Sequence, residues 1–318
     1  MTSTGVARRA RDERGFALLV VLLVLALVAV VGAEFAYSMR LEASAVRAYK
    51  SGIIGTHLAE TAIEQAIREI VADAPYVVED DDGLLTFYGA DRRALPRLPR
   101  TKAEMTGGAF SYRITDEEAR LNVNAVQPDR VDRLLQTLGV DKEVRDTIVD
   151  SIQDWRDPND EHRANGAESE DYYLKLPVPY RAHNANLESI TELLQIKGVT
   201  PAIYNGTKDK PGLASLVTVR SSGTNVNINT AGPAVLTALG FSVAEITQIH
   251  QSRRNSGPYV NVPGNFGARN LTATTRTFRI EAEGIVDDRV AARLTAIVQK
   301  RTDVDPPSVL VLEWSGPR

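Results

Sequence analysis

The sequence contains no cysteine, so no disulfide framework can hold any part of the chain together. This absence is compatible with either side of a membrane. Motifs of common enzyme classes are also missing: there is no H-E-x-x-H pair, no G-x-S-x-G elbow and no G-x-x-x-x-G-K-[ST] loop. The four histidines are scattered along the chain, at His57, His162, His183 and His250. We therefore predict that the chain is not an enzyme, although a hydrolase using two carboxylates has no sequence signature to look for.

Charge of one sign is not in large excess. The formal net charge of −4 gives no general attraction to nucleic acid or to anionic lipid. With 318 residues, 43% of them hydrophobic and 25% charged, the chain can form one large core or two smaller ones. The composition is that of a stably folded protein.

One long apolar segment is present near the N-terminus. Residues 16–33 are eighteen residues without a charge, and a helix of that length reaches about 27 Å, close to the thickness of a bilayer core. Arg8, Arg9, Arg11 and Arg14 precede it, so the positive-inside bias places the first fifteen residues in the cytoplasm and the remainder outside. A cleaved signal peptide ending at Ala33 is the alternative.

The helical pattern continues beyond the apolar segment. Apolar side chains recur at spacings of three and four from Phe35 to about residue 71, and the stretch from Asp73 to Pro75 ends the pattern. No loop signal separates the two parts. We therefore predict one helix of nearly sixty residues, with lipid around one end and a globular domain packed on the other.

The N-terminal region resembles the type IV pilins and type II secretion pseudopilins. The resemblance lies in a short basic leader ending at Gly15, followed by Phe16 and the apolar helix. It implies that prepilin peptidase cuts between Gly15 and Phe16 on the cytoplasmic side, and that the new N-terminus at Phe16 is methylated. Glycine suits a scissile position because its backbone can lie close to a protease.

One position departs from most of that family. The fifth mature residue is Val20, where most members carry Glu. A carboxylate inside the bilayer costs several kcal/mol unless it finds a partner, which in pilins is taken to be the N-terminal amine of the preceding subunit. A subunit without a predecessor needs no such Glu. In this the chain is similar to the K-type minor pseudopilins, which are thought to sit at the tip of the pseudopilus with I-type and J-type partners, above the major pseudopilin.

The part after the helix is predicted to be α+β. Alternating or β-branched segments at residues 110–114, 278–282, 294–298 and 309–312 favour an antiparallel sheet packed on the helix, with Asp287 and Asp288 in a turn. The residues between the first two segments are mostly helical in pattern. The predicted divisions are a leader at 1–15, a transmembrane segment at 16–33, the helix and first part of the pseudopilin domain at 34–115, an inserted α-helical domain at 116–276, and the remaining strands at 277–318.

The insert contains an internal repeat. Asn122-Val-Asn124 and Asn227-Ile-Asn229 are 105 residues apart, and each precedes a Pro and a Leu-rich helix that ends at a Gly. Two similar helical hairpins are therefore expected. We interpret the Asn and Thr side chains as caps of the following helices.

The second copy also resembles the helix-hairpin-helix module of competence-type DNA receptors. Its start lies at Asn227, and Arg253, Arg254 and Gly257 lie near its end. This gives the alternative function, a membrane-tethered DNA-binding protein. Residues 116–200 contain eighteen acidic and ten basic residues, however, which is the wrong sign for phosphate binding. We interpret the two arginines as a solvated helix face.

An acidic loop follows the first hairpin. The carboxylates from Asp154 to Asp171 form a dense set of hard oxygen donors, a type that Ca²⁺ prefers. The spacing is not that of an EF-hand, and an acidic solvated loop without metal is the other interpretation. The resemblance to K-type pseudopilins extends through this insert and implies bound calcium. The candidate ligands are Asp154, Asp157, Asp160, Glu168 and Asp171.

Overall fold

The structure is a computed structural model, and it describes residues 6–80, 82–221, 223–267 and 269–316, with side chains from Phe16 onward. Residues 1–54 and 55–318 form two units, which are described separately. The first unit is helical throughout its described part and belongs to α1 (Val6–Val71). The first five residues of the predicted leader lie outside the described residues.

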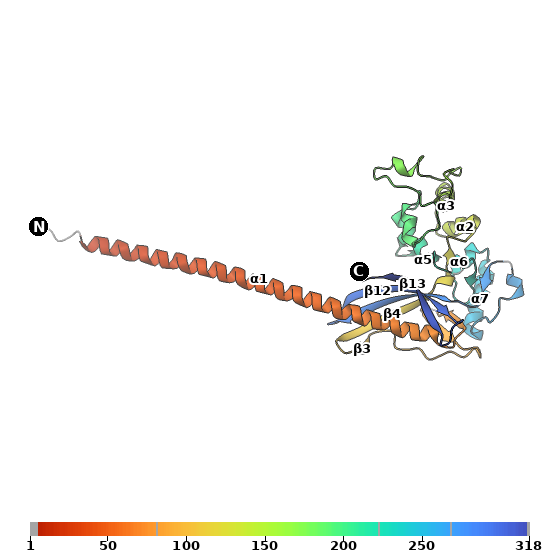
Figure 1. The fold of residues 1–318 in the computed structure, drawn as a ribbon, viewed down its shortest axis with the longest axis horizontal. Helices are drawn as coiled ribbons and strands as arrows, with labels where there is room; N and C mark the ends of the chain where they lie inside the picture. Colours follow the sequence, from red (N-terminus) through yellow and green to blue (C-terminus); the bar gives the residue numbers. More distant parts are fainter. Residues whose placement is uncertain (1–5, 81, 222, 268, 317–318) are drawn as a thin grey trace. The chain divides into compact units, whose positions relative to one another are not determined.

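A five-stranded antiparallel sheet organises the second unit (Figure 1). Its order is β13 (Ser308–Ser315), β12 (Arg289–Arg301), β11 (Thr277–Val286), β4 (Gly108–Asp116) and β3 (Ala103–Met105). Asp287 and Asp288 join β11 to β12 with φ of 51° and 58°, the left-handed conformations of a two-residue hairpin turn. The prediction of an antiparallel sheet with this turn is confirmed.

The C-terminal part of α1 packs on the sheet. Its buried side chains recur at helical spacing and are Leu58, Ala59, Ala62, Ile63, Ala66 and Ile70. The closest approach is between two glycines, because a Cβ on Gly284 would lie 1.8 Å from the carbonyl oxygen of Gly55. A side chain at either position would push the helix away from the sheet, so glycine sets this spacing. The predicted α+β fold, a long helix on an antiparallel sheet, is confirmed.

A buried ion pair fixes the end of the helix. Glu69 of α1 accepts bonds from Arg100 Nε at 3.0 Å and Nη2 at 2.7 Å, and from the Tyr112 hydroxyl at 2.5 Å. Burial and the Glu69 hydrogen bond raise the pKa of Tyr112. Lys300 Nζ donates to the carbonyl of Ala72 at 2.7 Å, just past the last helical turn. A β-hairpin that the sequence analysis did not predict follows, formed by β1 (Tyr76–Glu79) and β2 (Leu85–Tyr88).

The residues between β4 and β11 form helices around a core of their own. The elements in chain order are η1 (Glu117–Ala119), β5 (Leu121–Asn122), α2 (Pro128–Thr137), α3 (Lys142–Arg156), η2 (Tyr173–Lys175), η3 (Ile190–Gln195), α4 (Pro201–Asn205), β6 (Gly206–Thr207), β7 (Lys210–Pro211), α5 (Leu213–Leu216), β8 (Val217–Thr218), β9 (Val226–Asn227), α6 (Pro233–Ala238), α7 (Val243–Ser256), η4 (Gly264–Phe266) and β10 (Leu271–Thr272). Trp155, Tyr173 and Phe266 are the largest side chains buried there. The structure thus has helices where the insert is predicted, and its limits at 116–276 stay a prediction.

The internal repeat has a structural counterpart. In each copy a two-residue strand precedes two helices and forms a parallel pair with a strand that follows them. β5 precedes α2 and α3 and pairs with β8, and β9 precedes α6 and α7 and pairs with β10. Gly139 and Gly240 link the helices of each pair with φ of 80° and 86°, a conformation that favours glycine. The two expected helical hairpins are both present.

Candidate functional site

The apolar part of α1 is the first candidate. From Phe16 to Lys50 every side chain is exposed, including the whole apolar segment at 16–33. Among the described residues this is the one helix long and apolar enough to cross a membrane, with a mean hydropathy of 3.2 over its most apolar stretch. Exposed apolar side chains of this number require lipid or other apolar helices around them. The predicted cleavage position, between Gly15 and Phe16, lies within α1.

The repeated asparagines hold distant loops together. The Asn122 and Asn227 side chains accept bonds from the backbone N–H two residues on, at 2.9 and 3.0 Å, which forms an Asx turn in each copy. Asn124 then bonds both backbone groups of Leu187, and Asn229 bonds both backbone groups of Tyr259. The interpretation of these asparagines as helix caps is wrong. The N-cap residues of α2 and α6 are Gln127 and Gly232, and neither helix start has a side-chain cap bond.

An arginine from the second helix of each pair supports the same turns. Arg156 Nη1 donates to Val123 O at 2.7 Å, and Arg253 Nε donates to Ile228 O at 2.7 Å. Arg253 is 6% exposed and burial lowers its pKa to about 10. The interpretation of Arg253 as part of a solvated face is therefore wrong, whereas Arg254 is exposed. Backbone carbonyls that lie more than twenty residues upstream bind the guanidinium and make its burial possible.

The hairpin geometry does not favour DNA binding. A helix-hairpin-helix module would offer phosphate the free N–H groups at the start of its second helix. Here the Ser242 side chain caps α7, and the carboxylate of Glu245 in the first turn accepts a hydrogen bond from the Ser242 backbone N–H at 2.8 Å. The equivalent α3 begins after Asp141 and carries Glu143 in its first turn. Acidic side chains thus lie where phosphate would bind.

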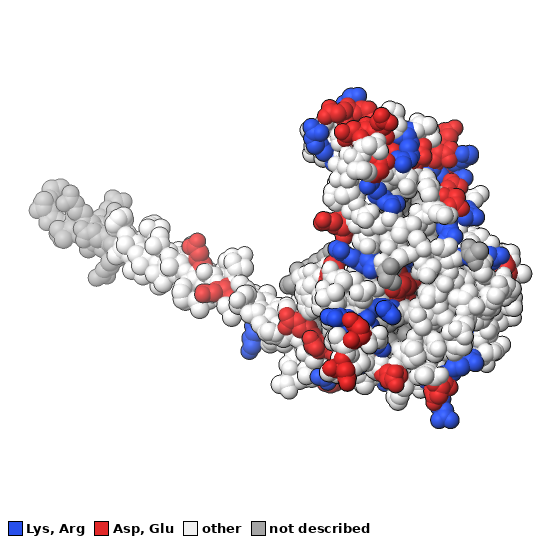
Figure 2. Space-filling model, turned by 45° about the vertical axis from the view of Figure 1, so that its right-hand side comes forward, with Lys and Arg blue, Asp and Glu red and all other residues white. Residues whose placement is uncertain are grey.

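The acidic loop is the second candidate site. Figure 2 shows acidic and basic side chains crowded together at the end of the insert, the region drawn in green in Figure 1. Asp154 is fully buried there, and its carboxylate accepts bonds from the backbone N–H of Arg163 and Ala167 and from Arg163 Nη1 at 2.6 Å. A Cβ on Gly166 would lie 1.8 Å from Asp154 Oδ2. Asp154 therefore organises the loop through hydrogen bonds of its own.

Glu168 is the unusual member of the loop. It is 1% exposed, and neither carboxylate oxygen makes a hydrogen bond of good geometry, although the nearby Ser169 backbone N–H acts to lower its pKa. Burial, together with the negative charges of Asp154, Asp157 and Asp160, raises its pKa to about 7. Burying a carboxylate that has no well-aligned donor is energetically costly, and this distinguishes Glu168 from its neighbours, two of which pair with Arg163.

The other predicted ligands surround this cluster unequally. Arg163 Nη1 also binds Asp157 at 2.6 Å, Asp160 accepts a bond from the Asn184 side chain at 3.1 Å, and Asp171 accepts one from the Glu168 backbone at 2.8 Å. The Asn184 side-chain oxygen is buried without a partner, and its residue has a φ of 50°. Within the described residues no three carboxylates or histidines converge in the geometry of a metal site. The Arg163 guanidinium lies between two of the carboxylates instead.

The sequence did not identify Asn184 as a candidate metal ligand, because Asn184 lies 24 residues from Asp160 and belongs to a segment without regular structure. The donor set of Glu168, Asn184, Asp157 and Asp160 consists of oxygens alone, which is the chemistry that Ca²⁺ selects. The residues thus fit a calcium ion in their chemistry, and the side chain of Arg163 would have to leave Asp157 for the ligands to close around it.

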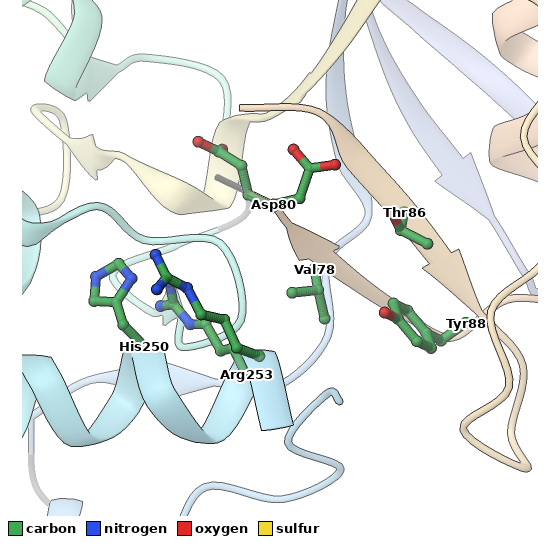
Figure 3. A pocket seen from close by; sticks show the side chains of 8 residues that line it. Val78, Asp80, Thr86, Tyr88, His250 and Arg253 are labelled. Atoms are coloured by element: carbon green, nitrogen blue, oxygen red, sulfur yellow. The ribbon is translucent and has the colours of Figure 1, made fainter. Parts of the chain in front are cut away.

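A pocket of about 200 Å³ lies between the β1–β2 hairpin and α7 (Figure 3). The figure shows His250 and Arg253 of α7 on one side, with Asp80, Thr86 and Tyr88 of the hairpin on the other. Its walls carry both signs of charge. With Arg253 bound to backbone carbonyls, the pocket holds no arrangement of nucleophile and base among the described residues that line it.

Comparisons with known proteins agree with these features. The model of the family described as "Type II secretion system (T2SS), protein K" matches residues 113–209. Type II secretion system protein K of Pseudomonas aeruginosa is 30% identical over 72% of this chain and 68% of the relative. That of Pectobacterium carotovorum is 30% identical over 60% of each chain. The chain thus spans between 60 and 68% of the length of these relatives.

A solved structure also matches the fold. In the crystal structure of the GspK-GspI-GspJ complex from enterotoxigenic Escherichia coli, one chain aligns with a TM-score of 0.59 at 17% identity. The alignment covers 87% of this chain and 99% of that one. At this identity the match supports the fold. Together with the sequence relatives, it shows that the chain belongs to the type II secretion system protein K family, a structural component of that system.

Proposed function

We propose that this protein is a minor pseudopilin at the tip of the type II secretion pseudopilus, where it initiates and caps assembly for protein secretion across the outer membrane. The observation that carries the proposal is the exposed apolar helix of the first unit. Such a helix is stable in lipid before assembly and among other apolar helices afterwards. The function is binding, and no catalytic step is part of it.

Val20 supports a position at the tip. It lies on the apolar part of α1 and is 40% exposed. Because a valine offers no carboxylate to the amine of a preceding subunit, this chain lacks the contact that would place it below another one. The additional helices between β4 and β11 enlarge the domain in a way that would obstruct a subunit above it.

The proposed partners are the I-type and J-type minor pseudopilins, with the major pseudopilin below them. The matched chain of known structure was crystallised in a complex with two such proteins, GspI and GspJ. We further propose that prepilin peptidase cleaves between Gly15 and Phe16 and that Phe16 is methylated. The protein would cross the inner membrane once, with its N-terminus in the cytoplasm and the second unit in the periplasm, as the arginines before residue 16 favour.

Calcium is the proposed cofactor of the acidic loop. Glu168 and the Asn184 side-chain oxygen would bind it with Asp157 and Asp160, while Asp154 and Asp171 position the loop through their bonds to its backbone. The ion would supply the positive charge that the buried Glu168 carboxylate requires, and thereby order the loop. Its role is structural.

Cross-linking tests the function directly. Because the chain has no cysteine, a single Leu22→Cys substitution on the exposed helix gives one reactive thiol, and Lys175→Cys on the exposed surface of the insert is the matched control. In membranes that contain single-cysteine partners, the thiol at position 22 should cross-link to the I-type or J-type minor pseudopilin, whereas the thiol at position 175 should not cross-link to their helices. Failure of the thiol at position 22 to capture either partner, or a filament whose tip lacks the protein, would contradict the proposal.

A further inference from the structure

The chain leaves the sheet after β4 and returns to it before β11, and these two segments meet at a group of buried carboxylates. Asp116 ends β4 and Glu118 lies in η1, while Thr277 begins β11 and Thr275 lies two residues before it. Asp116 is 1% exposed and Glu118 is 4% exposed. Buried acidic side chains therefore connect the end of β4 to the segment that leads into β11.

Asp116 is held by neutral donors from the second repeat and from the segment that leads into β11. Its carboxylate accepts bonds from Asn227 Nδ2 at 2.8 Å, Thr230 Oγ1 at 2.6 Å and Thr275 Oγ1 at 2.6 Å, and from the backbone of Glu118 at 2.8 Å. These bonds join the end of β4 to the second Asn-x-Asn turn. Opening this junction would loosen the contact between that turn and the sheet.

Glu118 completes the junction from the other side. It accepts bonds from the backbone N–H of Arg276 at 2.8 Å and of Thr277 at 3.1 Å, and its Oε2 contacts Thr275 Oγ1. The Thr275 hydroxyl thus touches both carboxyl groups but has a single hydrogen to donate. It can donate to one group only, so the second contact is a hydrogen bond only if the other carboxyl carries a proton and donates it to Thr275.

Glu117 lies at the same junction but is paired with two arginines. It is bound by Arg120 Nη1 at 2.9 Å and by Arg279 Nε at 2.7 Å, and these guanidinium groups keep its pKa below the ordinary value despite burial. Burial and the charge of Asp116 instead raise the pKa of Glu118 to about 7, and burial raises that of Asp116. The three neighbouring acids therefore divide into one that stays ionised and two that compete for ionisation.

We propose that Asp116 and Glu118 share one proton through Thr275, and that this protonated pair is a pH-sensitive latch between the insert and the sheet. When the pair loses its proton, two buried carboxylates face each other across one hydroxyl, and the junction loosens. A cavity of about 130 Å³ lined by Glu118, Thr275 and Asn225 gives the proton a route to solvent.

Other charged groups face the latch and define its electrostatic surroundings. They are Glu79 of β1, Arg113 of β4, Glu117 of η1, Arg120 after η1, Arg276 before β11, and Arg279 and Glu281 of β11. The sign of the effect follows from the raised pKa. The folded state holds the proton more tightly than the unfolded state, so stability is greatest at low pH and decreases as pH rises from about 4.5 to about 7. For a shift of this size the latched-to-open ratio falls on the order of tens-fold between about pH 5 and about pH 8.

The test compares Glu118→Gln with Glu117→Gln in the full chain in detergent. Gln imitates a protonated Glu, so in E118Q the latch's share of the pH dependence between about pH 5 and about pH 8 should disappear. Thermal unfolding should then depend less on pH than in the wild type, and the hydrogen-exchange protection of residues 224–232 and 272–280 should no longer fall as pH rises. E117Q should lower stability equally at both pH values and leave the slope of the wild type. Glu168, whose pKa is raised as well, is unchanged in all three proteins, so the difference between variants reports the latch.

An infrared measurement does not depend on the folding of E118Q. It uses Glu168→Gln, because the wild-type Glu168 has a raised pKa as well and would give a band of its own. A protonated-carboxyl band present at about pH 5.5 in this folded variant and lost by about pH 8 supports the shared proton. The absence of such a band at both pH values, or a pH slope unchanged in E118Q, would overturn the proposal.

Discussion

Glu168→Gln should have opposite effects on the calcium-free and calcium-bound protein. The buried carboxylate has no well-aligned donor, and its pKa is raised from 4.5 to about 7, so its charge destabilises the folded state fully only well above pH 7. At about 1.4 kcal/mol per pKa unit the limit is about 3 kcal/mol. We expect a gain of about 2 kcal/mol for the variant, because the Gln amide also stays buried without partners. That gain corresponds to a rise in Tm of about 4–8 °C.

Thermal unfolding of the full chain in detergent measures this effect, in EGTA and in millimolar Ca²⁺. In EGTA at about pH 8 the variant should be more stable than the wild type, and the difference should vanish at about pH 5, where the wild-type Glu168 is protonated. Ca²⁺ should stabilise the wild type more than the variant, because only the wild type offers the carboxylate. Glu170→Gln is the control, since Glu170 is an exposed residue of the same loop. A variant that is less stable in EGTA, or an equal Ca²⁺ shift in both proteins, would refute the reasoning.

Two further predictions concern the packing of α1 on the sheet. Glu69→Ala leaves the buried Arg100 guanidinium without its counter-charge, so we expect the free energy of unfolding to fall by about 3–5 kcal/mol in denaturant titration. The control Lys142→Ala breaks an exposed pair and should lower it by under about 0.5 kcal/mol. Equal losses in the two variants would argue against the burial of the first pair. Gly284→Ala brings a Cβ into the Gly55 carbonyl and should cost about 2–3 kcal/mol in the same assay; an unchanged midpoint would show that the helix does not approach the sheet so closely.

Local periodicity was sufficient to predict the helix and the sheet. The end of α1 at Val71, the four longer strands of the sheet and the Asp287–Asp288 turn depend on patterns within a few residues, and these patterns are visible in the sequence. The short edge strand β3 was not predicted. The β1–β2 hairpin was missed because its strands have only four residues each. Short segments of this kind give too little alternation to distinguish strand from loop.

The repeat shows where sequence reasoning stops. The Asn-x-Asn pattern correctly predicted two related hairpins, but the partners of Asn124 and Asn229 lie 63 and 30 residues away. Local capping rules could not identify those contacts. Arg253 was misplaced for the same reason, because its acceptors come from a turn in a distant part of the chain. For the acidic loop, composition located the cluster, whereas the burial that distinguishes Glu168 from its neighbours depends on the tertiary fold.

Intact-mass and N-terminal analysis of protein extracted from membranes tests the central claim most directly. A pseudopilin keeps its apolar helix after processing, so the account predicts a membrane-bound chain that begins at methylated Phe16. A freely soluble chain that begins at Glu34, with the apolar segment removed, would contradict it.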